Sequence, residues 1–227
     1  MGLIEEHKAE RRGRILAAAR TLIAERGYDG LTMRDLAQAS RVSVPTLYNL
    51  FGGKQAIILG ELETTFAAVL AGMEEARGRS FVAQAYAACE AATRDWLSAP
   101  AYSRELVRLF MTSEESGPIR RQTEEQYVAL MTAQLAVAQE TGEIAGWVEP
   151  VAVARRMYAH YTHAMIQWAH GELDAEGFRA ATLFGMSLML LGITRGGAAR
   201  EVARRAKAVQ ARLGEGRTRP ARQGGRR

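Results

Sequence analysis

The sequence has little cysteine, little proline and no long apolar run. Cys89 is the single cysteine among 227 residues, which excludes an internal disulfide framework and is typical of a reducing cytoplasm. The longest apolar stretch, residues 180–193, includes two glycines and is too short to span a bilayer. The first thirty residues are charged throughout, so we expect no signal peptide. We predict a soluble, cytoplasmic protein with no membrane partner.

The sequence also lacks the common motifs of catalysis. It contains no glycine-rich phosphate loop, no nucleophile elbow and no carboxylate pair placed for acid–base work. His160 and His163 are one helical turn apart and could share a metal ion, but no nearby Cys or acidic triplet completes the site. We predict a protein that is not an enzyme and needs no cofactor. A metal-dependent helical enzyme that uses His160 and His163 remains the alternative of a different class.

An apolar content of 48% with only five prolines favours an all-α protein. Within it, residues 31–54 (LTMRDLAQASRVSVPTLYNLFGGK) predict two short helices joined by a tight turn. Thr32 and Ser43 are suited to cap the two helices, Pro45 fits the first turn of the second, and Gly52-Gly53 ends it. Two such helices form a helix-turn-helix unit, whose second helix fits the major groove of DNA.

At these residues the chain resembles the amino-terminal DNA-binding domain of the TetR family of bacterial transcriptional regulators. The similarity runs from about residue 12 to about residue 59 and includes RRGRILAAARTLIAERG, MRDLAQAS and VSxPTLYxxF followed by Gly-Gly-Lys. Arg41 stands at the turn position where the family usually has glycine, and it is within reach of a phosphate. The resemblance implies a DNA-contacting set made up of Thr32, Arg41, Ser43, Val44, Pro45, Thr46, Tyr48, Asn49 and Lys54.

Charge is distributed unevenly along the chain. Residues 1–54 carry nine Lys/Arg against six Asp/Glu, residues 55–194 carry ten against seventeen, and residues 195–227 carry eleven against two. Basic ends around an acidic middle suit a protein that touches phosphates at its ends. We divide the chain into a helix-turn-helix domain (1–54), a helical ligand-binding and dimerisation domain (55–195), an extra short helix (196–213) and a basic disordered tail (214–227).

The last two long predicted helices, about 150–170 and 174–194, correspond to the pair that TetR-like proteins use to form a homodimer. We assign the interface to Met186, Leu188, Met189 and Leu191, and expect Gly185, Ser187 and Gly192 to permit close backbone approach. The alternative is that both helices belong to the core of a single chain.

The resemblance also implies a pocket for a small, apolar inducer inside the central domain. The helix predicted from Lys54 to about residue 76 joins that domain to the helix-turn-helix unit, and Gly52-Gly53 predicts a hinge at its amino end. The pocket candidates are Trp96, Phe110, Met111, Tyr127, Met131 and Tyr161. The predicted function is a repressor that binds double-stranded DNA at a palindromic operator, at the nucleoid, and is released by the inducer. A DNA-binding regulator that is independent of any ligand remains the closer alternative.

Overall fold

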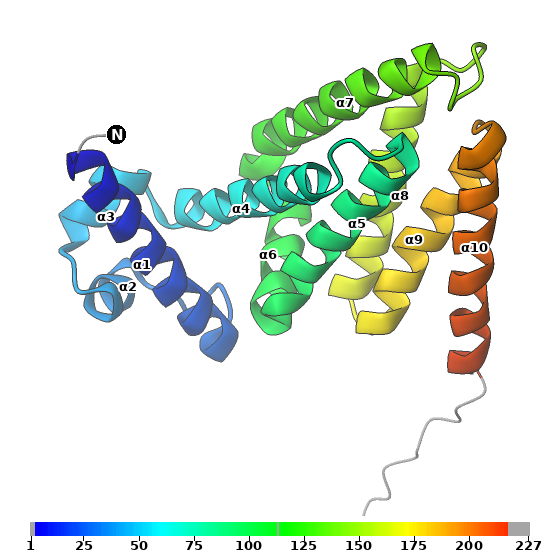
Figure 1. The fold of residues 1–227 in the computed structure, drawn as a ribbon. Coiled ribbons are helices and arrows are strands. Elements are labelled where there is room, and N and C mark those ends of the chain that lie inside the picture. Colours follow the sequence, from blue (N-terminus) through cyan, green and yellow to red (C-terminus); the bar gives the residue numbers. More distant parts are fainter. Residues whose placement is uncertain (1–2, 113, 218–227) are drawn as a thin grey trace, which may run out of the picture.

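The computed structural model describes residues 3–112 and 114–217 of the chain, and the described part is helical without a β-strand (Figure 1). The expected all-α fold is confirmed. No helix in these ranges is long and apolar enough to cross a bilayer. The helices are α1 (Leu3–Arg26), α2 (Met33–Ser40), α3 (Val44–Phe51), α4 (Lys54–Glu75), α5 (Phe81–Ser98), α6 (Pro100–Thr112), the 3-10 helix η1 (Glu114–Ser116), α7 (Gly117–Glu140), α8 (Pro150–Ala169), α9 (Ala175–Leu191) and α10 (Gly196–Arg217).

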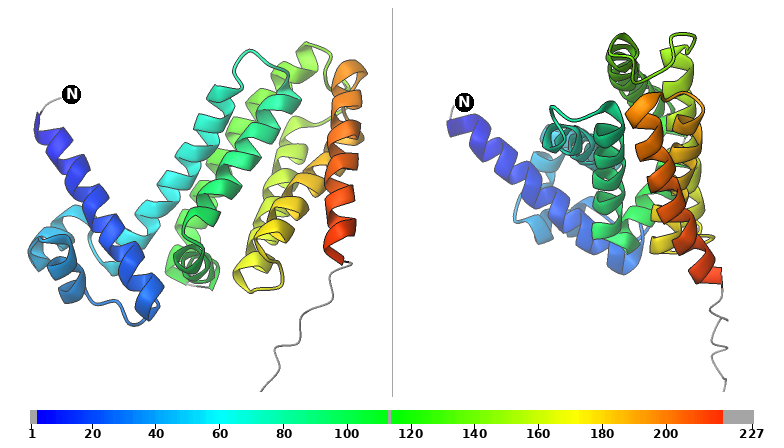
Figure 2. Two further views of the ribbon diagram at one scale, coloured as in Figure 1. Left: turned by 60° about the horizontal axis from the view of Figure 1, so that its bottom comes forward. Right: turned by 45° about the vertical axis from the view of Figure 1, so that its right-hand side comes forward.

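The helices form a small amino-terminal group and a larger body (Figures 1 and 2). Helices α1 to α3 lie together at one side of the molecule, and α4 runs from them into the body, where it lies along α5. Helices α5 to α9 make up the body, and α10 covers α9 at its outer edge. Because α4 begins beside the amino-terminal group and continues into the body, it is the covalent connection between them.

The two parts also share one apolar core. Ile15 of α1, Leu36 of α2 and Leu47 of α3 are fully buried, and the same cluster continues into α6 and α8 through Leu106 and Trp168. Burial of several such side chains, each contributing about 1.5–3 kcal/mol, resists separation of α1 from α6. The helix-turn-helix group is therefore docked on the body as well as tethered to it.

Helices α4 and α5 approach each other closely at Gly72. A Cβ atom at this position would lie 2.6 Å from the carbonyl oxygen of Ala87 and 2.8 Å from the Cβ of Ala91. Both are short of any normal carbon contact, so only glycine permits this spacing of the two helices. The neighbouring Val69 and Met73 are buried in the same contact.

Helices α8 and α9 are also in close contact, but within one chain. A Cβ atom at Gly185 would lie 2.1 Å from the His160 ring, and Ser187 is hydrogen-bonded to the hydroxyl of Tyr86. We had assigned Gly185 and Ser187 to close approach between two chains. Their small size instead serves packing inside the monomer, because His160 and Tyr86 fill the space that they leave.

Helix α10 is longer than the sequence indicated. It continues to Arg217 rather than ending at 213, so that residues 214–217, assigned to the tail, lie within it. Val202 and Ala206 are buried, and the guanidinium of Arg205 lies 4.4 Å from the centre of the Tyr86 ring. The rest of the predicted disordered tail, 218–227, lies outside the described residues.

Candidate DNA-reading surface and inner cavity

We call the amino-terminal group α1 to α3 the reader. The first helix of its helix-turn-helix unit, α2, is defined by caps at both ends. The Thr32 hydroxyl accepts a hydrogen bond from the Asp35 amide at 3.1 Å, which satisfies an amide that the helix leaves unpaired. At the other end Arg41 adopts the left-handed conformation, with φ 54°. Such a conformation costs a non-glycine residue about 1–2 kcal/mol. The expected left-handed turn at Arg41 is thus present, and the backbone amides of Arg41 and Val42 close it onto α2.

The second helix, α3, begins and ends where the sequence indicated. The Ser43 hydroxyl accepts from the Thr46 amide at 3.3 Å, Pro45 occupies the first turn, and Gly52 ends the helix at φ 86°. Leu47 is fully buried, whereas the Tyr48 side chain is 51% exposed. The helix therefore packs one face inward and leaves the opposite face open to a partner.

The exposed face of α3 brings most of the predicted DNA-contacting residues together. Pro45, Tyr48 and Asn49 are exposed on it, and Ser43 and Arg41 are exposed just before the helix. Val44 and Thr46 are half-buried, and Thr32 is exposed at the start of α2. The Thr32 and Ser43 side chains are already engaged as caps, so their part in this surface is to fix the helices rather than to offer a free hydroxyl.

Two arginines of α1, which the sequence analysis did not single out, hold α2 and α3 in place. Arg12 donates to the carbonyl of Leu50 at 2.9 Å, and its guanidinium lies 4.4 Å from the centre of the Phe51 ring. Arg14 donates to the carbonyl of Ser40 at 3.1 Å. Both carbonyls lie at helix carboxyl ends, where cations are favoured. The sequence places both arginines in the basic motif RRGR of α1. Only the fold shows which backbone carbonyls their side chains bind.

Lys54 has a second role beside the one we assigned. Its ammonium nitrogen lies 4.1 Å from the centre of the Tyr28 ring, and burial lowers the Lys54 pKa, with Asp29 acting in the opposite direction. Cation–π contacts of this kind contribute about 0.5–1 kcal/mol at partly exposed sites. Lys54 therefore ties the first turn of α4 to the end of α1 in addition to any contact with a phosphate.

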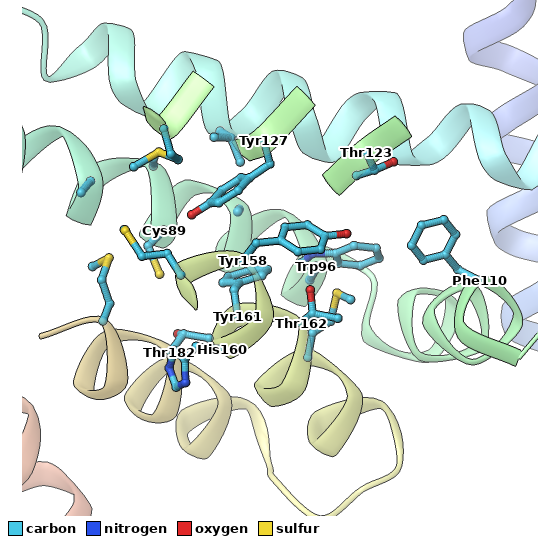
Figure 3. Close-up of a pocket in the computed structure, with 18 residues that line it drawn as sticks. Cys89, Trp96, Phe110, Thr123, Tyr127, Tyr158, His160, Tyr161, Thr162 and Thr182 are labelled. Carbon is cyan, nitrogen blue, oxygen red and sulfur yellow. The ribbon is translucent and has the colours of Figure 1, made fainter. Parts of the chain in front are cut away.

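A cavity of about 100 Å³ lies inside the body, lined by residues of α4, α5, α6, α7, α8 and α9 (Figure 3). Its walls are apolar and aromatic, and four methionines from three helices contribute to them. Val69 reaches it from α4. The lining residues are Val69, Ala85, Ala88, Cys89, Ala92, Trp96, Phe110, Thr123, Tyr127, Met131, Met157, Tyr158, His160, Tyr161, Thr162, Met165, Thr182 and Met186.

Polar atoms are few in this wall, and burial dominates their chemistry. Burial raises the pKa of the Cys89 thiol to about 12 and the pKa values of Tyr127 and Tyr161 above their usual range. Hydrogen bonding by Thr182 and Thr93 lowers the Cys89 pKa less than burial raises it. The Cys89 thiol is therefore neutral. Figure 3 shows the Tyr127 hydroxyl directed toward Cys89. No Asp, Glu, Lys or Arg is among the described lining residues, and His160 is the one basic side chain among them.

Five of the six predicted pocket residues line this one cavity, namely Trp96, Phe110, Tyr127, Met131 and Tyr161. Met111 does not; it packs instead against the core shared with the reader, because it follows Phe110 by one helical position and points elsewhere. The small residues of α5 and the methionines of α8 were missed. Alanine and methionine are common in any helical core, so no sequence signal marks them as cavity walls.

The predicted interface residues separate into two groups. Leu188 and Leu191 are 53% and 38% exposed on α9, which is high for leucine and leaves this surface open to a partner. Met186 is buried and lines the cavity, and Met189 packs partly against the core of the body. Met186 therefore faces the interior of its own chain, and we remove it from the interface.

The two histidines of α8 are turned to different surroundings. His160 is half-buried in the cavity wall with Nε2 3.0 Å from the carbonyl oxygen of Ala181, whereas His163 is exposed. Across the described residues, no group of three or more His, Cys, Asp or Glu side chains is placed to hold a metal ion. The metal-enzyme alternative therefore has no third ligand in that part of the chain.

Comparison with known proteins agrees with this geometry. Residues 15–60 match the family model described as bacterial regulatory proteins, tetR family. An uncharacterized HTH-type transcriptional regulator of Mycobacterium bovis is 29% identical over 139 residues, which cover 60% of this chain and 71% of that protein. The chain is therefore a helix-turn-helix DNA-binding regulator. Its helix-turn-helix domain, residues 15–60, is of the TetR type.

Solved structures share its fold. SmeT, the repressor of a multidrug efflux pump of Stenotrophomonas maltophilia, superimposes with a TM-score of 0.66 at 18% identity, over 82% of this chain and 92% of that one. The fatty acid degradation regulator FadR of Bacillus halodurans gives a TM-score of 0.63 at 15% identity, over 79% and 98%. At these identities the likeness establishes the helical architecture of both domains.

The state of Cys89 can be measured directly because the chain has no other cysteine. With a pKa of about 12, its thiolate fraction at mildly alkaline pH is on the order of a thousandfold below that of an ordinary thiol. We expect the native protein to react very slowly with a disulfide reagent such as Ellman's, and the guanidinium-unfolded protein to react rapidly. Equal rates in the two states would contradict a half-buried thiol that is kept neutral in the native protein.

Proposed function

We propose that this regulator is a repressor that binds a palindromic operator as a homodimer and leaves it when a small molecule enters the inner cavity. The proposal places it in the cytoplasm, at the nucleoid when bound to DNA. The observation that carries it is the position of Val69, which lies on α4 and lines the cavity. The same helix begins at Lys54, beside the reader.

The coupling follows from how α4 is held. A ligand that fills the cavity presses on Val69, and Gly72, one turn further on, has no space to yield toward α5. The force is then relieved by movement of α4 away from α5, which displaces the amino end of α4 and the reader attached to it. A ligand shifts this equilibrium only by its different affinity for the two positions of α4, and such couplings are typically ~1–3 kcal/mol.

The proposed dimer joins α8 and α9 of two copies. Leu188 and Leu191 offer an exposed apolar surface on α9, and Trp147, 72% exposed in the loop before α8, extends it. The backbone pairing of Ile144 with Thr194 places this loop beside the end of α9. Large apolar side chains exposed on one helix and on the loop beside its end are typical of a surface that a partner covers. A two-fold dimer would present two readers to two half-sites.

The operator proposal is tested by selecting duplexes from a randomised DNA library with the full-length protein. We expect an inverted repeat whose half-sites are about one helical turn, or a multiple of it, apart. Asymmetric selected sites would contradict paired reading.

On the selected duplex, Asn49→Ala should cost ~1–3 kcal/mol of binding energy, because we assign its exposed amide to a base edge. On random DNA the same change should have little effect. Lys54→Ala is the comparison: it should weaken both duplexes alike and reduce the salt slope by about one, as loss of a phosphate contact does. Equal losses from Asn49→Ala on both duplexes, by fluorescence anisotropy, would remove Asn49 from base reading.

The dimer proposal predicts that Leu188→Arg yields a monomer with lost operator binding. A buried interface does not solvate an unpaired charge, so the change should dissociate the dimer at micromolar concentration. Leu70→Arg is the matched control, since Leu70 is 43% exposed on α4, away from α8 and α9. Sedimentation velocity distinguishes the two variants. A wild-type protein that sediments only as a 24.9 kDa species would refute the dimer.

The switch proposal predicts that Gly72→Ala lowers operator affinity about tenfold without any ligand, within the usual range of coupling energies. The added Cβ meets the Ala87 carbonyl and pushes α4 off α5, as a cavity ligand would. Ala71 is exposed and stands one position before Gly72, so Ala71→Gln is the matched control and should leave the affinity unchanged. If Gly72→Ala folds by circular dichroism and binds the selected duplex like wild type, α4 displacement does not control DNA binding.

A further inference from the structure

We infer that the cavity is built for a compact, neutral molecule with a hydrogen-bond acceptor, such as a carbonyl or ether oxygen, on an apolar body. This inference rests on the proposed function, because it takes the cavity to be the ligand site, and it specifies the chemistry of that ligand. It is carried by three observations: an indole N–H without an acceptor, described lining residues without Asp, Glu, Lys or Arg, and the size of the space.

The unpaired donor is the indole nitrogen of Trp96. Trp96 lines the cavity from α5 and is only 5% exposed, and its Nε1 is fully buried with no hydrogen-bond partner among the described residues. An indole N–H can only donate. A buried donor left without an acceptor is costly, so an acceptor brought by a ligand would be stabilised there beyond its apolar contacts.

Two phenol groups in the same wall add to this preference. The buried Tyr161 hydroxyl has no hydrogen-bond partner of good geometry among the described residues, and the nearby Thr93 hydroxyl lowers the Tyr161 pKa less than burial raises it. Tyr127 contacts Tyr158 ring to ring. Burial keeps both phenols protonated, so each retains a proton to donate.

The wall discriminates against ions. Its other polar groups are mostly engaged within the chain: the Thr182 hydroxyl donates to the Phe178 carbonyl at 3.0 Å, and His160 Nε2 lies 3.0 Å from the Ala181 carbonyl oxygen. With no charged side chain among the described lining residues, a carboxylate or ammonium would lose its hydration without gaining a counter-ion. A neutral ligand avoids that loss.

The volume sets the scale of the molecule. A cavity of about 150 Å³ holds benzene, so about 100 Å³ sets the scale at a single ring, and a ring with one small substituent enters only when the walls adjust. The four methionines, Met131, Met157, Met165 and Met186, are the walls that adjust most readily, because their unbranched side chains change rotamer at little cost.

Four probes of almost identical shape separate these features. Acetophenone carries a neutral acceptor, α-methylstyrene replaces its oxygen by a methylene group, benzoate carries a negative charge, and benzamidine a positive one. We expect acetophenone to bind the full-length dimer about fivefold more tightly than α-methylstyrene, as one unshared hydrogen bond allows, and the two ions not to bind measurably by calorimetry.

Trp96→Phe should remove the preference for acetophenone while α-methylstyrene still binds. Trp168→Phe is the matched control: the Trp168 indole nitrogen is also buried and unpaired in the described structure, but Trp168 is not among the lining residues. Should Trp96→Phe fail to fold, ¹⁵N spectra of the wild-type indoles provide the same test. Acetophenone should shift the Trp96 N–H proton downfield, and α-methylstyrene should not.

Each other outcome overturns the inference. Equal affinity for acetophenone and α-methylstyrene refutes the acceptor, binding of benzoate or benzamidine refutes neutrality, and no binding by any probe refutes the compact size. The proposed function fails separately: acetophenone that binds with the expected preference but leaves operator affinity unchanged removes the switch and keeps the ligand class. If both neutral probes release the operator equally, the switch stands and the preference for a hydrogen-bond acceptor is refuted.

Discussion

The close contact between α4 and α5 at Gly72 is the constraint on which the rest of the structure depends. There the backbone of α5 lies where a side chain at position 72 would have to be, so the two helices have one tight spacing. Val69, one turn away, closes the inner cavity, and Lys54 at the far end of the same helix meets Tyr28 of the reader. The wall of the cavity and the attachment of the reader thus depend on the position of one helix, α4.

Rigidity of the reader determines what a movement of α4 can do. Arg12 and Arg14 bind the carboxyl ends of α3 and α2, and Lys54 fastens α4 to the end of α1. These contacts, together with the buried Leu47, make internal distortion of the helix-turn-helix unit costly. Displacement of α4 would therefore move the reader as a body and alter its distance from a partner reader, leaving the shape of each reading surface unchanged.

The sequence predicted the reader well because its determinants are local. Caps at Thr32 and Ser43, the turn at Arg41 and the glycine stop at Gly52 act within a few residues, so their pattern is legible without the fold. The body was predicted less evenly. Met186 and Met111 sit in apolar helices whose several faces are all plausible cores, and only the packing shows which face meets the cavity. Gly185 was correctly read as a close approach, but sequence does not say whether the approaching group, here His160, comes from the same chain.

The inner cavity and the unpaired donors in its wall, on Trp96 and Tyr161, both lower the stability of the ligand-free body. A helical core of this size could be filled by larger apolar residues in place of Ala85, Ala88 and Ala92, and each filled void would stabilise the chain by roughly 1 kcal/mol or more. Leaving the space open, with the Trp96 N–H unsatisfied beside it, lowers the stability of the ligand-free state. A ligand that filled the space and accepted the Trp96 hydrogen bond would gain this free energy on binding. Val69 forms part of the same wall, so under the proposed switch some of that energy would be released only when α4 moves, which is the condition for a cavity to control a distant surface.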